Sequence, residues 1–267
     1  MSAASGTAAG GAGRSDADLP PVLAVLDGVK RFGGVVALDH VSVAVHAGEV
    51  LALLGDNGAG KSTLIKCLAG VHRLDAGSTE MDGVPVRIDS PAAAQALGIE
   101  TVYQDLALFD NLDPAANFYA GRELAGPRWL PRSMRVLRPR EMRAATLAVI
   151  DELRVTIPAG RVTVGLMSGG QRQAVAVARA AAFASRVVIL DEPTAALGAR
   201  ESRSVLDLIV RLRAQGKAVI VISHALDHVI EVADRAIVMR RGRVVGEEIP
   251  TRESQPRIVS LIVGGEA

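Results

Sequence analysis

A glycine-rich run that ends in a lysine and two hydroxyl residues constrains this chain more than any other feature. It reads Gly-Asp-Asn-Gly-Ala-Gly-Lys-Ser-Thr and lies between an apolar stretch, Val50 to Leu54, and a helix-like stretch, Thr63 to Leu68. Glycines at these spacings let the backbone curl until its N–H groups point inward at an anion. The positive end of the following helix adds to that attraction. A strand, this loop and a helix together predict a P-loop.

The residues of this loop are candidate ligands of ATP and Mg²⁺. Lys61 is expected to reach the β- and γ-phosphates, and Ser62 to offer its hydroxyl to the metal. A glycine-rich turn without a ligand is the alternative, and the full spacing with Lys-Ser disfavours it. The candidate nucleotide ligands here are Gly55, Asp56, Asn57, Gly58, Ala59, Gly60, Lys61, Ser62 and Thr63.

A second motif is an apolar run, Val187 to Leu190, that ends in Asp191 and Glu192. A strand ending in Asp places a carboxylate beside the P-loop, where it can hold Mg²⁺ directly or through water. Glu192 is the candidate base that deprotonates or orients the attacking water. An isolated Asp-Glu pair after a strand is usually a surface cap, but a P-loop in the same chain favours the catalytic interpretation.

A third motif, Met-Ser-Gly-Gly-Gln, precedes the helix-like run Ala174 to Phe183. Serine is a favoured N-cap residue, and a helix start is an anion site, so this motif predicts a second such site apart from the P-loop. One γ-phosphate does not need two such sites from one small subunit. We therefore expect this one to contact the nucleotide of a partner subunit. Its candidate residues are Ser168, Gly169, Gly170 and Gln171.

The apolar runs predict an α/β fold with a mostly parallel sheet covered by helices. Each run is four or five residues long and rich in β-branched residues or Leu, as in strands buried on both faces. The two ends of the chain, by contrast, favour antiparallel pairs. The predicted parallel strands are Val50 to Leu54, Ile99 to Tyr103, Val187 to Leu190 and Ala218 to Ile222. The predicted antiparallel strands are Val22 to Val29, Val41 to Val45, Ile237 to Met239 and Val244 to Glu247.

The domain organisation follows from changes in composition along the chain. The first residues are Ala, Gly and Ser with no apolar signal-peptide centre, which indicates a disordered tail. Five arginines, at 128, 132, 135, 138 and 140, mark an exposed loop inside a helical region. The expected division is a tail (1–20), then one ATPase domain (21–264) made of a core (21–104 and 180–264) and a helical insertion (105–179).

Bulk properties exclude several classes of protein. A formal net charge of +1 over 267 residues offers no basic face for nucleic acid. Cys67 is the only cysteine, so no intramolecular disulfide is possible, and its helical setting suggests a small buried hydrophobe. No run approaches the eighteen or so apolar residues of a membrane span. We therefore expect a cytosolic chain unless a partner holds it at a membrane.

These motifs resemble those of the ATP-binding cassette ATPases over about residues 22–264, with Met167 where the family signature has Leu. The resemblance implies a P-loop NTPase (RecA-like) core with an N-terminal antiparallel β subdomain and an inserted helical subdomain. It also implies roles for three residues. Gln104 would sense Mg²⁺ and couple to the membrane subunit, His224 would contact the γ-phosphate, and Phe32 would stack on adenine.

One expectation about these residues does not need the family. Gly55, Gln104, Asp191 and His224 each fall just past the C-terminal end of a predicted strand. If those strands are parallel, all four converge on one edge of the sheet, where ligands bind in open α/β folds.

Thr194 to Gly198 resembles the branch that drives import of simple sugars such as ribose, xylose or fructose, although the wider family has Asp where Gly198 stands. The resemblance implies a second ATPase subunit in a homodimer, a multi-span permease and, indirectly, an extracytoplasmic sugar-binding protein. The place of action would be the cytoplasmic face of the cell membrane. Alternatives are the same motor for an amino acid or a drug, a cassette ATPase acting on nucleic acid or ribosomes, and a P-loop kinase. The chain has neither sustained heptads nor a second P-loop, and a kinase leaves Ser168 to Gln171 unexplained.

Overall fold

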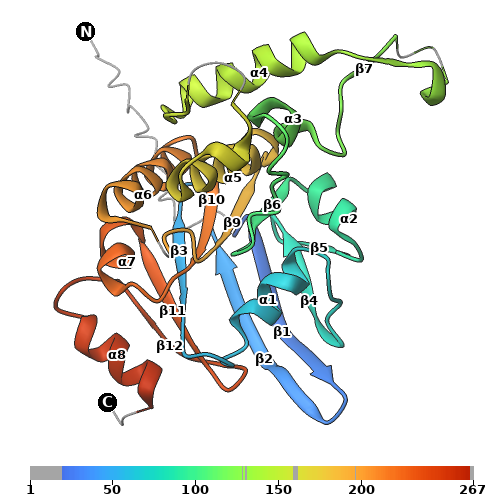
Figure 1. Cartoon of the computed structure of the whole chain (residues 1–267). Coiled ribbons are helices and arrows are strands. Elements are labelled where there is room, and N and C mark those ends of the chain that lie inside the picture. The colour runs from blue at the N-terminus through green and yellow to red at the C-terminus, as the bar shows by residue number, and fades with distance from the viewer. Residues whose placement is uncertain (1–19, 128, 130, 159–161, 196, 265–267) are drawn as a thin grey trace, which may run out of the picture.

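The computed structural model describes residues 20–127, 129, 131–158, 162–195 and 197–264 (Figure 1). The predicted tail lies almost wholly outside these residues. The strands are β1 (Leu23–Phe32), β2 (Val35–Val45), β3 (Val50–Leu54), β4 (Ala76–Met81), β5 (Val84–Val86), β6 (Ile99–Val102), β7 (Ala125–Gly126), β8 (Val136–Leu137), β9 (Val187–Asp191), β10 (Ala218–Ile222), β11 (Arg235–Arg240) and β12 (Arg243–Glu248). The helices are α1 (Lys61–Leu68), α2 (Pro91–Ala96), α3 (Pro114–Tyr119), α4 (Pro139–Glu152), α5 (Gly169–Phe183), α6 (Ala199–Ala214), α7 (Leu226–Val232) and α8 (Gln255–Val263), with short 3₁₀ turns at Arg132–Met134 and Val164–Leu166.

The central sheet has the strand order β12-β11-β3-β10-β9-β6. The pairs from β11 to β6 are parallel, and β12 forms an antiparallel hairpin with β11 at the edge. All four predicted parallel strands and the predicted hairpin are therefore confirmed. Every residue of β3 and β10 is buried, which explains why these strands are apolar throughout rather than alternating.

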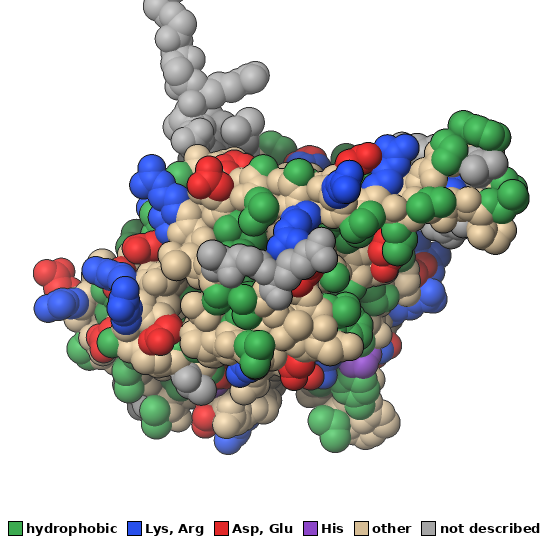
Figure 2. All heavy atoms as spheres, turned by 45° about the horizontal axis from the view of Figure 1, so that its top comes forward, with side chains coloured by type: hydrophobic (Ala, Val, Ile, Leu, Met, Phe, Trp, Pro, Cys, Tyr) green, Lys and Arg blue, Asp and Glu red, His purple; other side chains and the backbone are tan. Residues whose placement is uncertain are grey.

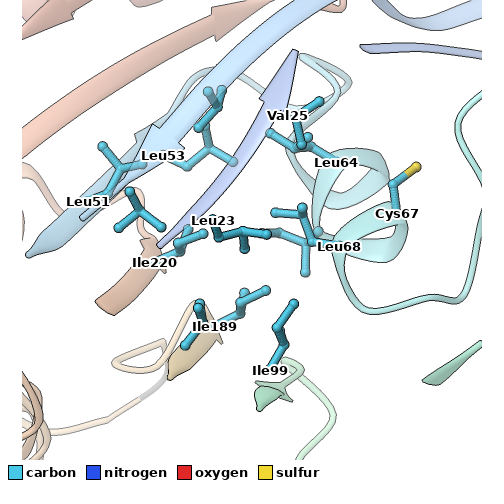
Figure 3. Close-up of a cluster of buried hydrophobic side chains, with 14 of the residues drawn as sticks. Leu23, Val25, Leu51, Leu53, Leu64, Cys67, Leu68, Ile99, Ile189 and Ile220 are labelled. Atoms are coloured by element: carbon cyan, nitrogen blue, oxygen red, sulfur yellow. The ribbon is translucent and has the colours of Figure 1, made fainter. Parts of the chain in front are cut away.

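Successive residues of each central strand point to opposite faces of the sheet and pack into different hydrophobic cores. Ile189 and Ile220 face a core that also contains β1 and α1, where Leu23, Leu64 and Leu68 converge on them (Figure 3). The intervening strand residues face the second core, formed with α5 and α6, to which Val188, Leu190, Val219 and Val221 contribute. Helices thus cover one face of the sheet, and α1 with the antiparallel sheet covers the other. This arrangement fixes the strand ends on which the site is built.

A second sheet, with the order β2-β1-β4-β5, is antiparallel. The sequence predicts β1 and part of β2, but not β4 or β5. Leu23 pairs with Met81 and Val29 with Ala76, so β4 depends on β1 for its place. The N-terminal antiparallel β subdomain is present.

The region between β6 and α5 carries α3, α4 and a two-stranded hairpin, β7 and β8, that projects from the body (Figure 1). The predicted exposed loop therefore contains a small sheet and a 3₁₀ turn. Hydrophobic side chains gather at its projecting end (Figure 2), and the exposed ones include Trp129, Met134, Val136 and Leu137. The division of the chain at 104/105 and 179/180 stays a prediction, and α5 runs through the second of these positions. Among the helices that the structure describes, none has the length and apolar character needed to cross a bilayer.

Candidate nucleotide site

The P-loop connects the end of β3 to α1 and is held in shape by its own lysine. Lys61 is only 6% exposed, and its Nζ donates to the carbonyl oxygens of Gly55 at 2.6 Å and Asp56 at 3.0 Å. The Asn57 N–H donates to the Asp56 carboxylate at 2.7 Å, which tightens the turn. Burial lowers the pKa of the Lys61 ammonium, opposed by the negative charges of Glu192, Asp56 and Asp191. The ammonium of Lys61 therefore lies at the centre of the loop, close to backbone carbonyl oxygens and to carboxylates.

Gly55 shows why the first residue of the loop must lack a side chain. Its φ of +142° lies outside the range that L side chains adopt readily. A Cβ there would stand 2.2 Å from the carbonyl oxygen of Met239 in β11. The close approach of β11 therefore requires a glycine at the first position of the loop.

One open cleft of about 450 Å³ is lined by three of the four residues that the strand ends were expected to bring together, Gln104, Asp191 and His224. Gln104 follows β6, Asp191 ends β9 and His224 follows β10, and these strands are adjacent or separated by one neighbour in the parallel sheet. The full lining is Val35, Val36, Ala37, Asn57, Gly58, Ala59, Gly60, Lys61, Ser62, Thr63, Gln104, Asp191, Glu192, Ile222 and His224. Gly55 and Asp56 are not among the lining residues; Gly55 is buried and Asp56 is exposed.

The start of β2 lines this cleft, which the sequence did not indicate. Val35, Val36 and Ala37 read as an ordinary apolar strand, and nothing in their spacing marks a ligand contact. The carbonyl oxygen of Ala37 lies against the P-loop, 2.7 Å from where a Cβ on Gly60 would stand. The antiparallel sheet therefore forms one wall of the site.

Glu192 and His224 form a direct contact inside the cleft. His224 Nε2 lies 2.9 Å from Glu192 Oε1. Glu192 has a φ of +51°, in the left-handed region, and its N–H donates to the Ile222 carbonyl oxygen at 3.0 Å. That bond to the end of β10 holds the carboxylate beside His224. Burial raises the pKa of the adjacent Asp191 carboxyl, and the charge of Glu192 adds to the rise.

The third motif starts α5, and Ser168 is its N-cap as predicted. The Gln171 N–H donates to Ser168 Oγ at 3.3 Å, and the Ser168 N–H donates to Gln171 Oε1 at 3.0 Å. This capping box satisfies part of the helix start internally, so fewer N–H groups are open than the sequence suggested. Ser168, Gly170 and Gln171 line a different cleft, of about 510 Å³, from the one that holds the P-loop.

Phe32 lies at the end of β1 and is 44% exposed. Its ring packs edge-on against His72 with centroids 5.1 Å apart, and Lys30 Nζ lies 5.4 Å from the ring centroid. It is not among the residues that line the P-loop cleft. The exposed ring is available to a planar base, and its contact with adenine stays a prediction.

The family model described as ABC transporter matches residues 38–195. The chain is 48% identical over 224 residues to the fructose import ATP-binding protein FrcA of Rhizobium meliloti, covering 84% of this chain and 86% of that protein. It is 44% identical, with the same coverage, to the xylose/arabinose import ATP-binding protein XylG of Sulfolobus acidocaldarius.

A solved nucleotide-free ATP-binding cassette from an ABC transporter superposes with a TM-score of 0.77 at 26% identity, covering 90% of this chain and 98% of that one. The family match spans more than half of the chain, and it includes both the P-loop and the Asp191-Glu192 strand end. The chain therefore belongs to the ABC transporter family, as one of its ATP-binding subunits with ATPase activity.

Proposed function

We propose that this chain is the ATP-hydrolysing subunit of an importer for a simple sugar. The observation that carries the proposal is the single cleft in which the P-loop, Gln104, Asp191, Glu192 and His224 meet. The sugar class is supported by the relatives, which are named for import of fructose and of xylose or arabinose. An importer of an amino acid or a drug is the alternative, because the motor itself does not touch the cargo.

The chain's own groups supply binding and proton transfer. Lys61 and the backbone N–H groups of the loop would hold the phosphates, as the buried ammonium and the start of α1 favour anions. Glu192 would accept the proton of the attacking water. Its contact with His224 fixes the direction of that carboxylate, and the histidine is then positioned to reach the γ-phosphate once nucleotide fills the cleft.

The donor set fits Mg²⁺. Ser62, Gln104 and Asp191 offer a hydroxyl, an amide and a carboxylate to the same cleft, and all-oxygen ligands are those that Mg²⁺ prefers. Within the described residues no group of three or more His, Cys, Asp or Glu side chains could hold a metal alone. A Mg²⁺ bound through so few protein ligands depends on phosphate oxygens as well. When bound, it would neutralise charge on the phosphates, and these three residues would hold it.

Two copies of the chain are proposed to enclose two ATP molecules. The signature residues Ser168, Gly170 and Gln171 line a cleft separate from the P-loop cleft of the same subunit. A symmetric pair can bring the signature of one subunit to the P-loop of the other, and the same contact then occurs twice. Nucleotide drives this closure only to the extent that it binds the closed state more tightly.

The proposed partners are a multi-span permease and, through it, an extracytoplasmic sugar-binding protein, with the chain on the cytoplasmic face of the membrane. The helical region presents exposed apolar side chains, among them Phe109, Trp129 and Leu166. Such side chains are typical of surfaces that a partner covers.

The test is the substitution Glu192→Gln, which removes the proposed base and keeps its size. We expect ATP affinity within about threefold of wild type and turnover reduced by about 100-fold or more, in the range typical of a lost general base. Nucleotide binding by fluorescence titration and phosphate release measure the two quantities. Asp227→Asn, which removes a carboxylate from the first turn of α7, is the matched control. Unchanged turnover in Glu192→Gln would remove Glu192 as the base.

A further inference from the structure

Glu192, the proposed base, begins a tight turn at the end of β9. The Ala195 N–H donates to the Glu192 carbonyl oxygen at 3.1 Å, which closes a four-residue turn. Glu192 has a left-handed φ of +51°, a conformation that surrounding contacts must maintain. The first end of the turn is held by β10, because the Glu192 N–H donates to the Ile222 carbonyl oxygen. The direction of the carboxylate also depends on how the other end is held.

The other end of the turn is held by a side chain of α7. Thr194 Oγ1 and His228 Nδ1 share a hydrogen bond at 3.0 Å. Thr194 is only 9% exposed, so its hydroxyl needs a partner from the protein. A hydroxyl can donate to an unprotonated Nδ1 and accept from a protonated one, so this bond forms with either tautomer of the histidine.

The packing around this bond is close. Pro193, Thr194 and His228 line a cavity of only about 10 Å³, together with Ser223 and Val229. His228 is itself held by the first turn of α7, where its N–H donates to the carbonyl oxygen of the N-cap residue at 3.1 Å. The turn after β9 therefore has little room to shift while the imidazole is in place.

Two histidines of one short segment thus contact the residues on either side of Pro193. His224 Nε2 lies 2.9 Å from the Glu192 carboxylate, and His228 contacts the Thr194 hydroxyl. His224 lines the P-loop cleft, whereas His228 is not among the lining residues. An effect of His228 on hydrolysis can therefore reach the cleft only through the turn.

We propose that His228 is a positioning residue for the base Glu192. Its bond to Thr194 fixes the backbone beyond Pro193, and the turn then keeps the Glu192 carboxylate in the orientation that contacts His224. Without that bond the carboxylate adopts several orientations and accepts the proton of the attacking water less often. This inference rests on the proposed role of Glu192 in hydrolysis.

The first test removes each partner of the hydrogen bond in the full-length chain. His228→Leu and Thr194→Val keep side chains of similar volume, and each is expected to lower kcat for MgATP hydrolysis by about tenfold. The Kd for ATP, measured by fluorescence titration, is expected to stay within about twofold of wild type. The double variant is expected to lose about tenfold in kcat and not about 100-fold, because both changes remove one bond. Wild-type kcat in either single variant would overturn the role of His228.

Variants that restore the bond separate positioning from packing. His228→Asn places an amide close to the position of Nδ1, and it is expected to recover at least half of wild-type kcat. His228→Gln extends its amide towards the position of Nε2, and it is expected to lose as much as His228→Leu. Equal kcat in the Asn and Gln variants would contradict the bond, and this comparison holds even if His228→Leu lowers the melting temperature.

A matched control lies on the same helix. Glu231→Gln removes the ion pair between α7 and Arg203 of α6 and leaves the contact with Thr194 in place. It is expected to match wild-type kcat. A tenfold loss in this control would show that the seating of α7 as a whole matters, and not the bond to Thr194.

A last measurement asks whether His228 acts through Glu192. In Glu192→Gln the base is absent, so adding His228→Leu is expected to change the residual kcat, followed with radiolabelled ATP, by less than about twofold. A further tenfold loss would overturn this inference and leave Glu192 as the base. Wild-type turnover in Glu192→Gln alone would instead remove the proposed base, and the role of His228 with it.

Discussion

Glu192 shows how a single residue is held in place for chemistry. A non-glycine residue with φ near +50° costs about 1–2 kcal/mol relative to the right-handed region, so surrounding contacts must fix it there. The bond from its N–H to Ile222 and the contact with His224 supply that constraint. The sequence predicts that Glu192 is the base because it follows Asp191 at a strand end. Its contact with His224 depends on the pairing of β9 with β10, in which Asp191 lies opposite Ile222. These two residues are 31 positions apart in the sequence, so a local sequence pattern does not predict the contact.

Cys67 gives a prediction about a residue with no proposed part in the chemistry. It is 6% exposed on α1, as the helical setting suggested, and burial raises the pKa of its thiol to about 11 from 9.0. At pH 8 about 0.1% of the folded-state thiol is ionised, against about 10% in the unfolded chain. Alkylation by iodoacetamide at pH 8 is therefore expected to be about 100-fold slower in the native protein than in urea. Comparable rates would show that the thiol is accessible and ionised.

The same thiol predicts a pH dependence of stability. Because the folded-state pKa is the higher one, the unfolded chain loses its proton first as pH rises. The free energy of unfolding is then expected to fall between about pH 9 and 11, and the fall should be smaller in Cys67→Ala. Denaturant titrations of both proteins across this range measure the difference, and parallel curves would contradict the shifted pKa.

At the scale of elements, strands whose burial is complete are predictable from sequence and strands that depend on pairing are not. β3 and β10 are apolar throughout, and β9 is apolar up to Leu190, since both faces of the sheet are covered. β4 reads Ala-Gly-Ser-Thr-Glu-Met, which has no apolar run, and its place comes from pairing with β1. α6 was not predicted, although Val205, Leu208, Ile209 and Leu212 recur at helical spacing and are all buried.

The cap of α5 yields a prediction for this element. Ser168→Ala removes the hydroxyl that accepts the Gln171 N–H, and it is expected to lower the free energy of unfolding by about 1 kcal/mol. Urea denaturation of the nucleotide-free protein measures the change. Ser204→Ala is the control, because that exposed hydroxyl lies within α6 and donates only to the Arg200 carbonyl oxygen. Equal stabilities of the two variants would show that the capping box contributes nothing.

At the scale of the whole molecule, the proposed pairing of two copies predicts that a defect in the P-loop cleft and a defect in the signature cleft complement each other. Lys61→Ala breaks the P-loop, and Ser168→Arg breaks the signature, so each homodimer has two defective sites. A mixed dimer combines both defects in one site and leaves the other intact. An equal mixture is expected to recover about a quarter of wild-type ATPase activity if subunits pair at random and sites act independently.

A matched mixture tests this reasoning. Lys61→Ala with Asp191→Asn places both defects in P-loop clefts, so every mixed dimer keeps two damaged sites and no activity should return. Phosphate release from purified, mixed proteins measures both cases. Recovery in both mixtures, or in neither, would contradict sites shared between subunits.

The bonds that Lys61 makes within its own loop affect how fast the protein takes up nucleotide. The ammonium already donates hydrogen bonds to two carbonyl oxygens of the loop, so the loop is ordered before any ligand arrives. The conformational entropy of the loop is therefore lost when the protein folds and not when the nucleotide binds. An arriving triphosphate only has to displace those carbonyls from a cation that is already aimed into the cleft. Uptake should then approach the rate at which nucleotide and protein collide in the correct orientation.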